Sequence, residues 1–342
     1  MRNRIIIALG LIVLTFGTGF SQPTSATKTD SGWVALFNGV NFNGFYIFSS
    51  VAPQVTNNLA TQTIFQVDSG RIHSPRLAGE FHLVTTREYS FYKVRLDYRW
   101  GPITGSQNAG MVIHIDNASA LAGAVPVGTL RPKSIEVQML RLTNQPFTLW
   151  SSTQLGPYIN TTVQTGTQNY LPASSGGVPW TNDPWGLRTL FTTVANPEVA
   201  LGQWNHGEAN VYGADSGSFF LNGVLRTRAW NFQVRVNIAN PTPRVAYGKG
   251  GIGIQQEDNE IWYRNYEIME IDSNTFIPIN ARRGCTNRTA ANYDPRAVVD
   301  NGSCSSTAIN AAIGKGHSSS SMMELGRHKL EILLGRIFHA PH

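Results

Sequence analysis

The segment FYKVRLDYRW, at 91–100, alternates apolar and charged side chains with a period of two. This is the period of a β-strand with one buried and one solvated face, and it does not fit a helix, whose apolar stripe recurs every three to four residues. The surrounding region, 31–272, is rich in Val, Ile, Phe, Tyr, Trp and Thr, with turn residues at short intervals. The chain is therefore predicted to be all-β. The side chains expected on the buried face of this segment are Val94, Leu96, Tyr98 and Trp100.

Two further segments, MVIHID and SIEVQML, show the same alternation. Because successive side chains of a strand point to opposite faces, the first presents His114 and Asp116 away from the core. The second presents Glu136 and Gln138 in the same way. A polar face is thus predicted on these strands. The side chains expected inside are Met111, Ile113, Ile115, Ile135, Val137 and Met139.

Turn and loop positions follow from Gly, Pro and Asn. Asn222 and Gly223 lie between two apolar runs and form the pair most typical of a tight hairpin turn. The segments 117–133 and 142–202 are rich in Gly, Pro, Ser, Thr and Asn. We expect them to be loop insertions over one end of the sandwich, where loops often carry specificity.

The charge of the chain argues against nucleic acid as a partner. The formal net charge is +6, but the region 31–272 holds 16 Lys and Arg against 16 Asp and Glu. The excess lies in the two ends of the chain. Binding to phosphates requires basic residues gathered on a folded face. A nucleic-acid-binding function is therefore not expected.

The two ends of the chain differ from its middle. Residues 1–22 have the basic start, short apolar run and small polar end of a signal peptide, and the run is too short for a stable membrane anchor. The protein is therefore expected to be secreted or periplasmic, or to reach the cell surface. Residues 305–342 are predicted as a Ser-rich linker and a terminal helix, which is either poorly packed or a membrane-surface or partner helix.

Cys285 and Cys304 lie close together near the C-terminus. In an exported protein a disulfide between them is the simplest interpretation. The alternative, half of a metal site, lacks the second pair of ligands that a closed zinc site needs. The module 284–304 is too small to have a core of its own.

A series of short motifs occurs in a fixed order across 31–272. They are GWVALFNG (32–39), FQVDSGRI (65–72), LVTTREY (83–89), NAGM (108–111), EVQML (136–140), GQWN (202–205), LNG (221–223), GIGIQ (251–255) and YRNYEI (263–268). This order resembles the 3-keto-disaccharide hydrolase family, which implies a concanavalin A-like jelly-roll sandwich. The family's usual Asn-Ser-Gly is Asn-Ala-Gly here, with Ala109, and Arg141 replaces the acidic residue that commonly follows its Glu-x-Gln strand.

A sugar site requires planar hydrogen-bonding groups, aromatic surface and, for cleavage, a carboxylate. From the polar strand positions and the matched motifs we predict three catalytic residues, Glu136, His114 and Arg264. Each has an alternative: Glu136 and Gln138 as hydrated surface residues, His114 as a structural histidine, and Arg264 as the partner of a nearby carboxylate. The residues predicted to bind substrate are Gln138, Asn108, Asp116, Trp204, Asn205 and Gln255.

The resemblance implies a carbohydrate substrate that carries a 3-keto group. Such a ketone acidifies the C2 proton, so elimination of the C1 oxygen needs a base and a group that stabilises the enolate. Glu136 or His114 is the predicted base and Arg264 the predicted stabiliser. The alternative functions are a non-catalytic carbohydrate-binding protein and an exported structural or adhesion module. No cofactor is predicted for the main domain, and the sequence does not indicate an oligomeric state.

The module 284–304 looks like a cysteine-bracketed repeat found at the ends of exported bacterial proteins. It contains oxygen-bearing side chains of the kind that bind Ca²⁺, but only two of them are carboxylates. A disulfide with turns is therefore favoured over a Ca²⁺ site. The candidate Ca²⁺ ligands are Asn292, Asp294, Asp300 and Asn301.

Overall fold

The structure is a computed structural model. It describes residues 32–49, 55–102, 107–121, 133–141, 145–151, 157–181, 189–237, 240–278, 281, 283–285, 287–294, 297, 299–300 and 302–305. The predicted signal peptide, the terminal helix and Asn301 lie outside the described residues. The described residues divide into two compact units, one up to Phe276 and one from Ile277.

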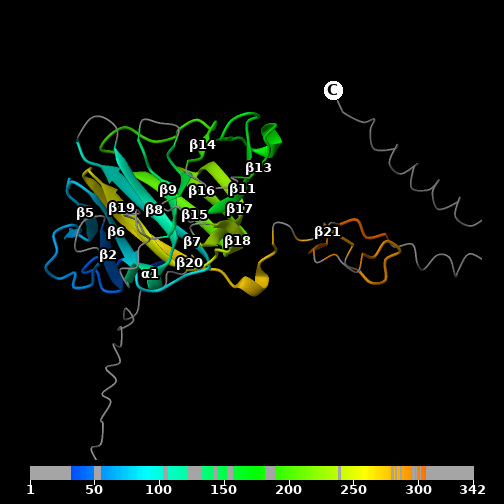
Figure 1. The fold of residues 1–342 in the computed structure, drawn as a ribbon, viewed down its shortest axis with the longest axis horizontal. Helices are drawn as coiled ribbons and strands as arrows, with labels where there is room; N and C mark the ends of the chain where they lie inside the picture. The colour runs from blue at the N-terminus through cyan, green and yellow to red at the C-terminus, as the bar shows by residue number, and fades with distance from the viewer. Residues whose placement is uncertain are drawn as a thin grey trace, which may run out of the picture. The chain divides into compact units, whose positions relative to one another are not determined.

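The first unit consists of two facing β-sheets (Figure 1). The larger, sheet A, has β7 between β15 and β20 at its centre, all antiparallel. Its described strands are β1 (Val34–Ala35), β4 (Gln66–Asp68), β5 (Arg71–Ser74), β7 (Phe91–Trp100), β11 (Tyr158–Val163), β12 (Asn169–Tyr170), β13 (Val178–Thr181), β14 (Phe191–Thr192), β15 (Asn205–Tyr212), β16 (Ser216–Leu221), β17 (Val224–Asn237), β18 (Asn240–Ala246) and β20 (Ile261–Glu270).

Sheet B is antiparallel throughout its described strands and runs in the order β10-β9-β8-β19-β6-β2-β3. Its members are β2 (Phe45–Ser49), β3 (Val55–Thr56), β6 (Glu80–Thr85), β8 (Asn108–Ile115), β9 (Ile135–Gln138), β10 (Thr148–Ser151) and β19 (Gly251–Glu257). The described helices are short: α1 (Asn117–Leu121), η1 (Ala173–Ser175) and η2 (Ser273–Thr275). Among the described residues, no helix is long and apolar enough to cross a membrane.

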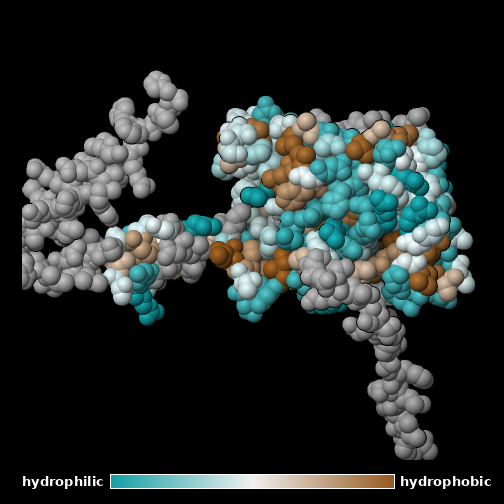
Figure 2. Space-filling model, turned by 180° about the vertical axis from the view of Figure 1, so that it is seen from behind, coloured by the Kyte–Doolittle hydropathy of each residue, from teal (hydrophilic) through white to brown (hydrophobic). Residues whose placement is uncertain are grey.

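The core lies between the inner faces of the two sheets. On β7 burial alternates along the whole strand, with Val94, Leu96 and Tyr98 fully buried, as the sequence predicts. Ile135 and Val137 of β9 join the same cluster from sheet B. The predicted all-β sandwich is confirmed. Seen from behind, its surface carries apolar residues in several small groups among hydrophilic ones (Figure 2).

A second, smaller apolar cluster lies on the opposite face of sheet B. It joins Tyr46, Val84, Val112 and Ile115 to Ala120 of α1. The Tyr46 hydroxyl donates to Asn117 Oδ1 at 2.8 Å, which fixes the start of α1 against the sheet. One part of this face is thus apolar and covered, and the rest is available for polar side chains.

Two predictions about turns and loops have different outcomes. The hairpin is confirmed: Leu221 pairs with Val224, and both Asn222 and Gly223 have positive φ, 48° and 78°, as a two-residue turn of this kind requires. The expectation that 142–202 is only a loop insertion is wrong. β10 to β14 all lie in it, because its Thr, Tyr and Val residues find partner strands such as β9 and β17.

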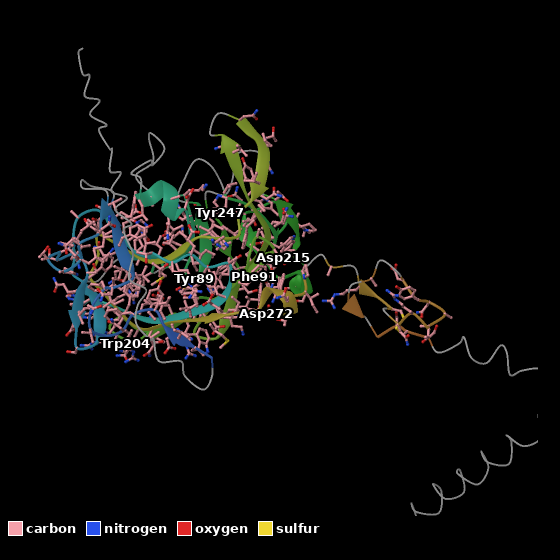
Figure 3. The ribbon with its side chains drawn as sticks, turned by 90° about the horizontal axis from the view of Figure 1, so that it is seen from below. Tyr89, Phe91, Trp204, Asp215, Tyr247 and Asp272 are labelled. Atoms are coloured by element: carbon pink, nitrogen blue, oxygen red, sulfur yellow. A yellow bond between two sulfur atoms is a disulfide. The ribbon has the colours of Figure 1, made fainter. Side chains whose placement is uncertain are left out.

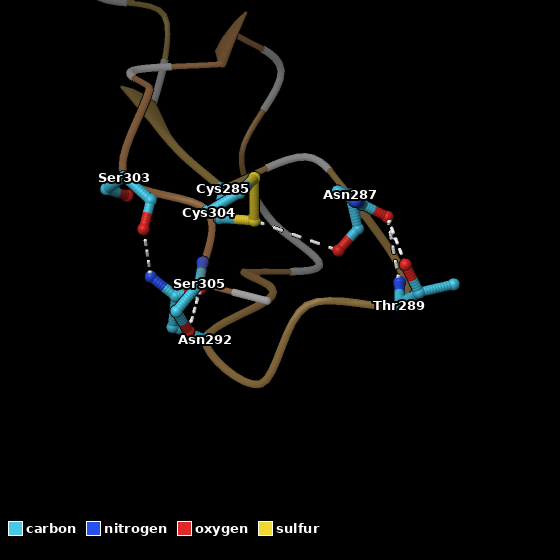
Figure 4. Close-up of a disulfide and its surroundings, with 7 residues drawn as sticks. All are labelled: Cys285, Asn287, Thr289, Asn292, Ser303, Cys304 and Ser305. Atoms are coloured by element: carbon cyan, nitrogen blue, oxygen red, sulfur yellow. Dashed lines mark hydrogen bonds between the residues drawn. A yellow bond between two sulfur atoms is a disulfide. The ribbon is translucent and has the colours of Figure 1, made fainter. Parts of the chain in front are cut away.

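The second unit is a small module held by one disulfide, Cys285–Cys304 (Figure 4). This confirms the predicted pairing. It also contains two short strands, β21 (Arg283–Gly284) and β22 (Val299–Asp300). The Asn292 side chain donates to the Ser303 carbonyl and accepts from the Ser305 amide, so it ties the closing segment of the module to its middle. Asn292 thus has a structural role here.

Candidate functional site

The face of sheet B that points away from the core carries a group of polar side chains, which we call the polar face: Glu80, His82, Glu136, Gln138 and Gln255. All five are buried, although none points into the core between the sheets. They are brought together by the strand register. His82 pairs with Gln255, and Gly110 pairs on one side with Gln255 and on the other with Gln138. Four adjacent strands therefore contribute to one patch.

Gly110 lies at the centre of this patch and leaves space for its neighbours. A Cβ at this position would lie 2.8 Å from Glu136 Cγ and 2.9 Å from Glu136 Oε1. It would also lie 2.9 Å from Gln255 Oε1. Two oxygen atoms, one from a carboxyl and one from an amide, therefore converge above the Gly110 backbone.

The orientation of the Gln255 amide is fixed by Glu80. Gln255 Nε2 donates to Glu80 Oε1 at 2.8 Å, and His82 Nε2 lies 3.3 Å from the same oxygen. The Gln255 carbonyl oxygen consequently points toward Glu136. It is buried and makes no hydrogen bond to another described residue. A buried acceptor of this kind is suited to a ligand hydroxyl.

Gln138 contributes a donor to the polar face. Its side-chain oxygen accepts from the Met139 amide at 2.9 Å, which directs its NH₂ group away from that bond. At the margin, Asn108 Nδ2 donates to Glu257 Oε2 at 2.8 Å across the β8–β19 pair. The structure thus brings Glu136, Gln138 and Gln255 together and places Asn108 beside them.

His114 does not lie on the polar face, so its predicted orientation is wrong. Its φ is 53°, and the register of β8 against β19 shifts here, between Gly251 and Gly253. Such a bulge reverses the alternation, so the imidazole turns into the core against the rings of Phe232 and Tyr247, at 6.1 and 5.6 Å. Ile115, predicted inside, joins the cluster under α1 instead. Burial lowers the pKa of His114 to about 4.

Arg264 lies on the outer face of sheet A, across the sandwich from Glu136. Its guanidinium donates to Asp97 Oδ2 at 3.1 Å and lies 4.1 Å from the centre of the Trp204 ring. The predicted cooperation of Arg264 with Glu136 on one substrate is therefore wrong. Trp204 also packs against Arg99, and Figure 3 shows it at the margin of the sandwich, away from Tyr247.

Asp116 and Asn205 hold loops in place. Asp116 forms an ion pair with Lys133 at 2.8 Å. Asn205 is buried, and its Oδ1 accepts from the Val199 amide and from Asn222 Nδ2, both at 2.9 Å. These contacts connect the 199–205 segment to the hairpin turn. Neither residue is part of the polar face.

Glu80 and His82 were not among the residues predicted for the site. Their signal is the alternation in EFHLVT, where Phe81 and Leu83 enter the core and leave Glu80 and His82 on the opposite face. Gly110 was also missed as a site position, because the space above it becomes visible only when β9 and β19 lie on either side. Among the described residues, no group of three or more His, Cys, Asp and Glu side chains is arranged to hold a metal ion.

The polar face combines a carboxyl group, a fixed amide acceptor and an amide donor in a buried setting. A carboxylate that converges with an acceptor oxygen on one point can remove a proton while the acceptor holds a neighbouring hydroxyl. An amide donor can stabilise charge that develops on a carbonyl oxygen. The patch is therefore suited to proton abstraction beside a ketone.

Comparison with known proteins gives one family match. Residues 32–269 match the model of the 3-keto-alpha-glucoside-1,2-lyase-like domain. No curated protein matches the chain in sequence.

Several solved structures resemble the chain at low identity. A candidate glycosyl hydrolase from Parabacteroides distasonis is 16% identical, with 72% of this chain and 99% of that chain covered and a TM-score of 0.43. The carbohydrate-binding module CBM66 from Bacillus subtilis is 9% identical, with 70% and 96% covered and a TM-score of 0.34. A Bacillus licheniformis beta-glucanase is 11% identical, with 70% and 97% covered and a TM-score of 0.35.

Proposed function

Because this chain belongs to the 3-keto-alpha-glucoside-1,2-lyase-like family, we propose that its polar face cleaves 3-keto glucosides by elimination, with Glu136 as the base. The observation that carries this proposal is the convergence of Glu136 Oε1 and Gln255 Oε1 above Gly110. A sugar bound there has one hydroxyl on the amide oxygen and the adjacent C–H bond within reach of the carboxylate.

The C3 ketone of the substrate makes elimination feasible. Glu136 takes the C2 proton, and the electron pair of that bond forms a C1–C2 double bond and expels the C1 oxygen. That oxygen leaves as an alcohol after taking up a proton from water. Addition of water across the double bond then yields the free 3-keto sugar. Gln138, whose NH₂ group is directed away from the Met139 amide, donates to the ketone oxygen as it gains charge.

Gln255 selects the substrate in this proposal. Its carbonyl oxygen can accept a hydrogen bond from a hydroxyl but cannot donate one. Glu80 prevents the amide from turning over, because the reverse orientation would place the Gln255 oxygen against the Glu80 carboxylate. A substrate lacking that hydroxyl would leave a buried acceptor unsatisfied, which costs about 1–3 kcal/mol.

The test compares wild type with Glu136→Gln on a 3-keto disaccharide and on the same disaccharide without the ketone. Loss of a general base slows the reaction by about 10²–10⁴-fold. Glu208→Gln, which changes a carboxylate on the outer face of sheet A, is the matched control and keeps full activity. Unchanged cleavage by Glu136→Gln would exclude Glu136 as the base.

The same experiment separates catalysis from binding alone. A non-catalytic carbohydrate-binding protein would bind the 3-keto disaccharide with no release of product by wild type. Isothermal titration of wild type and Glu136→Gln with this sugar measures binding independently of turnover. Binding without cleavage would replace the enzymatic proposal with the binding one.

We also propose that the protein is exported. The support is the signal-like N-terminal sequence together with a disulfide, a bond that persists in oxidising compartments. Fractionation of cells that express the full chain, with the mass of the mature protein measured, tests this. Recovery of the uncut chain from the cytoplasm would contradict it.

A further inference from the structure

A concave feature lies at the edge of the sandwich, apart from the polar face. It is a hollow of about 640 Å³, lined by the segments 40–45, 57–60 and 65–67 and by Gln62 and Thr86. The hollow lies where the ends of β2 and β6 in sheet B meet the segment that enters β4 in sheet A. Its volume falls within the range of about 300–1,000 Å³ that small-molecule sites occupy.

Every described residue that lines the hollow is neutral. Amide side chains supply most of the polar groups, and beneath them lie Phe42, Phe45 and Phe65, which are buried as part of the core. Val40 and Val67 are exposed at its margin. Without a formal charge, such a lining gives no ionic attraction for phosphate, carboxylate or ammonium groups. The amides are Asn41, Asn43, Asn57, Asn58, Gln62 and Gln66.

The hydrogen bonds of these amides divide them into two groups. Four of them bond to nearby residues and so shape the wall. Gln62 bonds in both directions with the backbone of Phe65, and Asn58 accepts from the Ala60 amide. Asn41 accepts from Asn38 Nδ2, and Gln66 donates to the Thr63 carbonyl. Asn43 and Asn57 are exposed, and their side chains make no hydrogen bond to another described residue. Each therefore offers both a donor and an acceptor to a ligand.

A lining of amides and apolar groups matches the chemistry of a neutral sugar. Amide groups can pair with adjacent hydroxyls, and the exposed side chains of Val40 and Val67 can contact the C–H face of a pyranose ring. An anion would find no cation among the described lining residues, and a purely apolar ligand would leave the amides without partners. Of the common ligand classes, the neutral saccharide fits both halves of this lining.

The hollow is too far from Glu136 to belong to the same site. Glu136 is on β9, and β9-β8-β19-β6-β2 are successive neighbours in sheet B. Four spacings of about 4.8 Å separate β9 from β2 by about 19 Å, which is longer than a disaccharide can bridge while it is held at both places. α1 and its apolar cluster cover part of the face between them.

We propose that the hollow is a second saccharide-binding site, which holds a neutral oligosaccharide independently of the polar face. A unit bound there attaches the protein to a longer neutral glycan and does not occupy the polar face. The proposal does not require Glu136 to act as a base.

The test measures binding of neutral tetrasaccharides, namely maltotetraose, cellotetraose and laminaritetraose, to the full chain by isothermal titration. A Glu136→Gln background prevents turnover. We expect saturable binding of at least one of them. Ala60→Trp, which places an indole in the hollow, and Asn57→Ala weaken it at least tenfold. Gln168→Ala, an exposed amide in the β11–β12 turn, is the matched control and leaves it unchanged.

Two further titrations separate this site from other sources of binding. Tetragalacturonate, an anionic tetrasaccharide, should bind at least tenfold more weakly than the best neutral one. Gln255→Ala should leave tetrasaccharide binding unchanged, because it alters only the polar face. The proposal is overturned if no neutral tetrasaccharide binds, if Ala60→Trp binds as well as wild type, or if Gln255→Ala removes the binding. None of these outcomes depends on whether 3-keto disaccharides are cleaved.

Discussion

Replacement of Gly110 by alanine is the most direct test of the geometry of the polar face. The added Cβ would lie 2.8 Å from Glu136 Cγ and 2.9 Å from both Glu136 Oε1 and Gln255 Oε1. Ordinary contacts between heavy atoms lie near about 3.5 Å or beyond, so each of these is about 0.6 Å too short. Both side chains must move apart to admit the methyl group.

The size of the effect follows from this overlap. Overpacking of this kind costs about 1–3 kcal/mol of folding free energy. In a domain of this size each kcal/mol lowers the melting temperature by about 2–4 °C, so we expect a decrease of about 2–12 °C. Displacement of a catalytic group by about 1 Å lowers the rate about 10²-fold, and we expect a loss of that order in cleavage of a 3-keto disaccharide.

Gly217→Ala is the control for the loss of stability. Its Cβ would lie 2.8 Å from the Phe219 ring, a similar overlap, but in the core near β17 and away from the polar face. Thermal unfolding and the initial rate of cleavage are measured for both variants below their transitions. Gly217→Ala should lose stability and keep its rate. If Gly110→Ala is equally active per folded molecule, the assignment of the site to this patch is refuted.

Three further predictions follow from individual contacts. Glu80→Ala removes the acceptor that orients Gln255, so kcat for cleavage should fall about tenfold. Glu80→Gln keeps an oxygen that can accept this hydrogen bond and should retain most of kcat. Equal kcat in wild type and both variants would exclude this positioning role. His114 has a pKa of about 4 in the folded state and about 6.5 when unfolded, so the unfolded state binds the proton more readily and folding stability is lost as the pH falls from 6.5 to 4. In urea unfolding, the free energy of unfolding lost between pH 7 and pH 4 should be larger in wild type than in His114→Asn, by up to about 3 kcal/mol. Equal losses in the two proteins would contradict a buried neutral imidazole. Arg264→Ala removes a half-exposed ion pair with Asp97 and a contact with Trp204, so it should lower the free energy of unfolding in urea by about 1 kcal/mol or less. The rate of cleavage should stay within twofold of wild type. A hundredfold lower rate would place Arg264 in the active site.

The sequence by itself determined the local pattern of the fold. The alternation in β7 fixed which of its side chains enter the core, because the period of a strand is a property of its own backbone. Asn222 and Gly223 fixed a hairpin turn, because few residue pairs tolerate two successive positive φ angles. The side of β9 that points away from the core was assigned to Glu136 and Gln138 for the same reason. The two cysteines lie only 19 positions apart, so a disulfide between them was the simplest prediction.

The tertiary structure alone decided which polar residues meet. β8 and β19 are neighbours in sheet B although about 140 residues separate them in the chain, and their pairing places Gln255 beside Gly110 and Glu136. The same pairing contains the bulge that turns His114 into the core, and no local pattern reveals it. Arg264 belongs to a neighbouring motif in the sequence but to the other sheet in space, because membership of a sheet is set by long-range hydrogen bonds. Local periodicity therefore identified Glu136 and Gln138, and strand order supplied the rest of their surroundings.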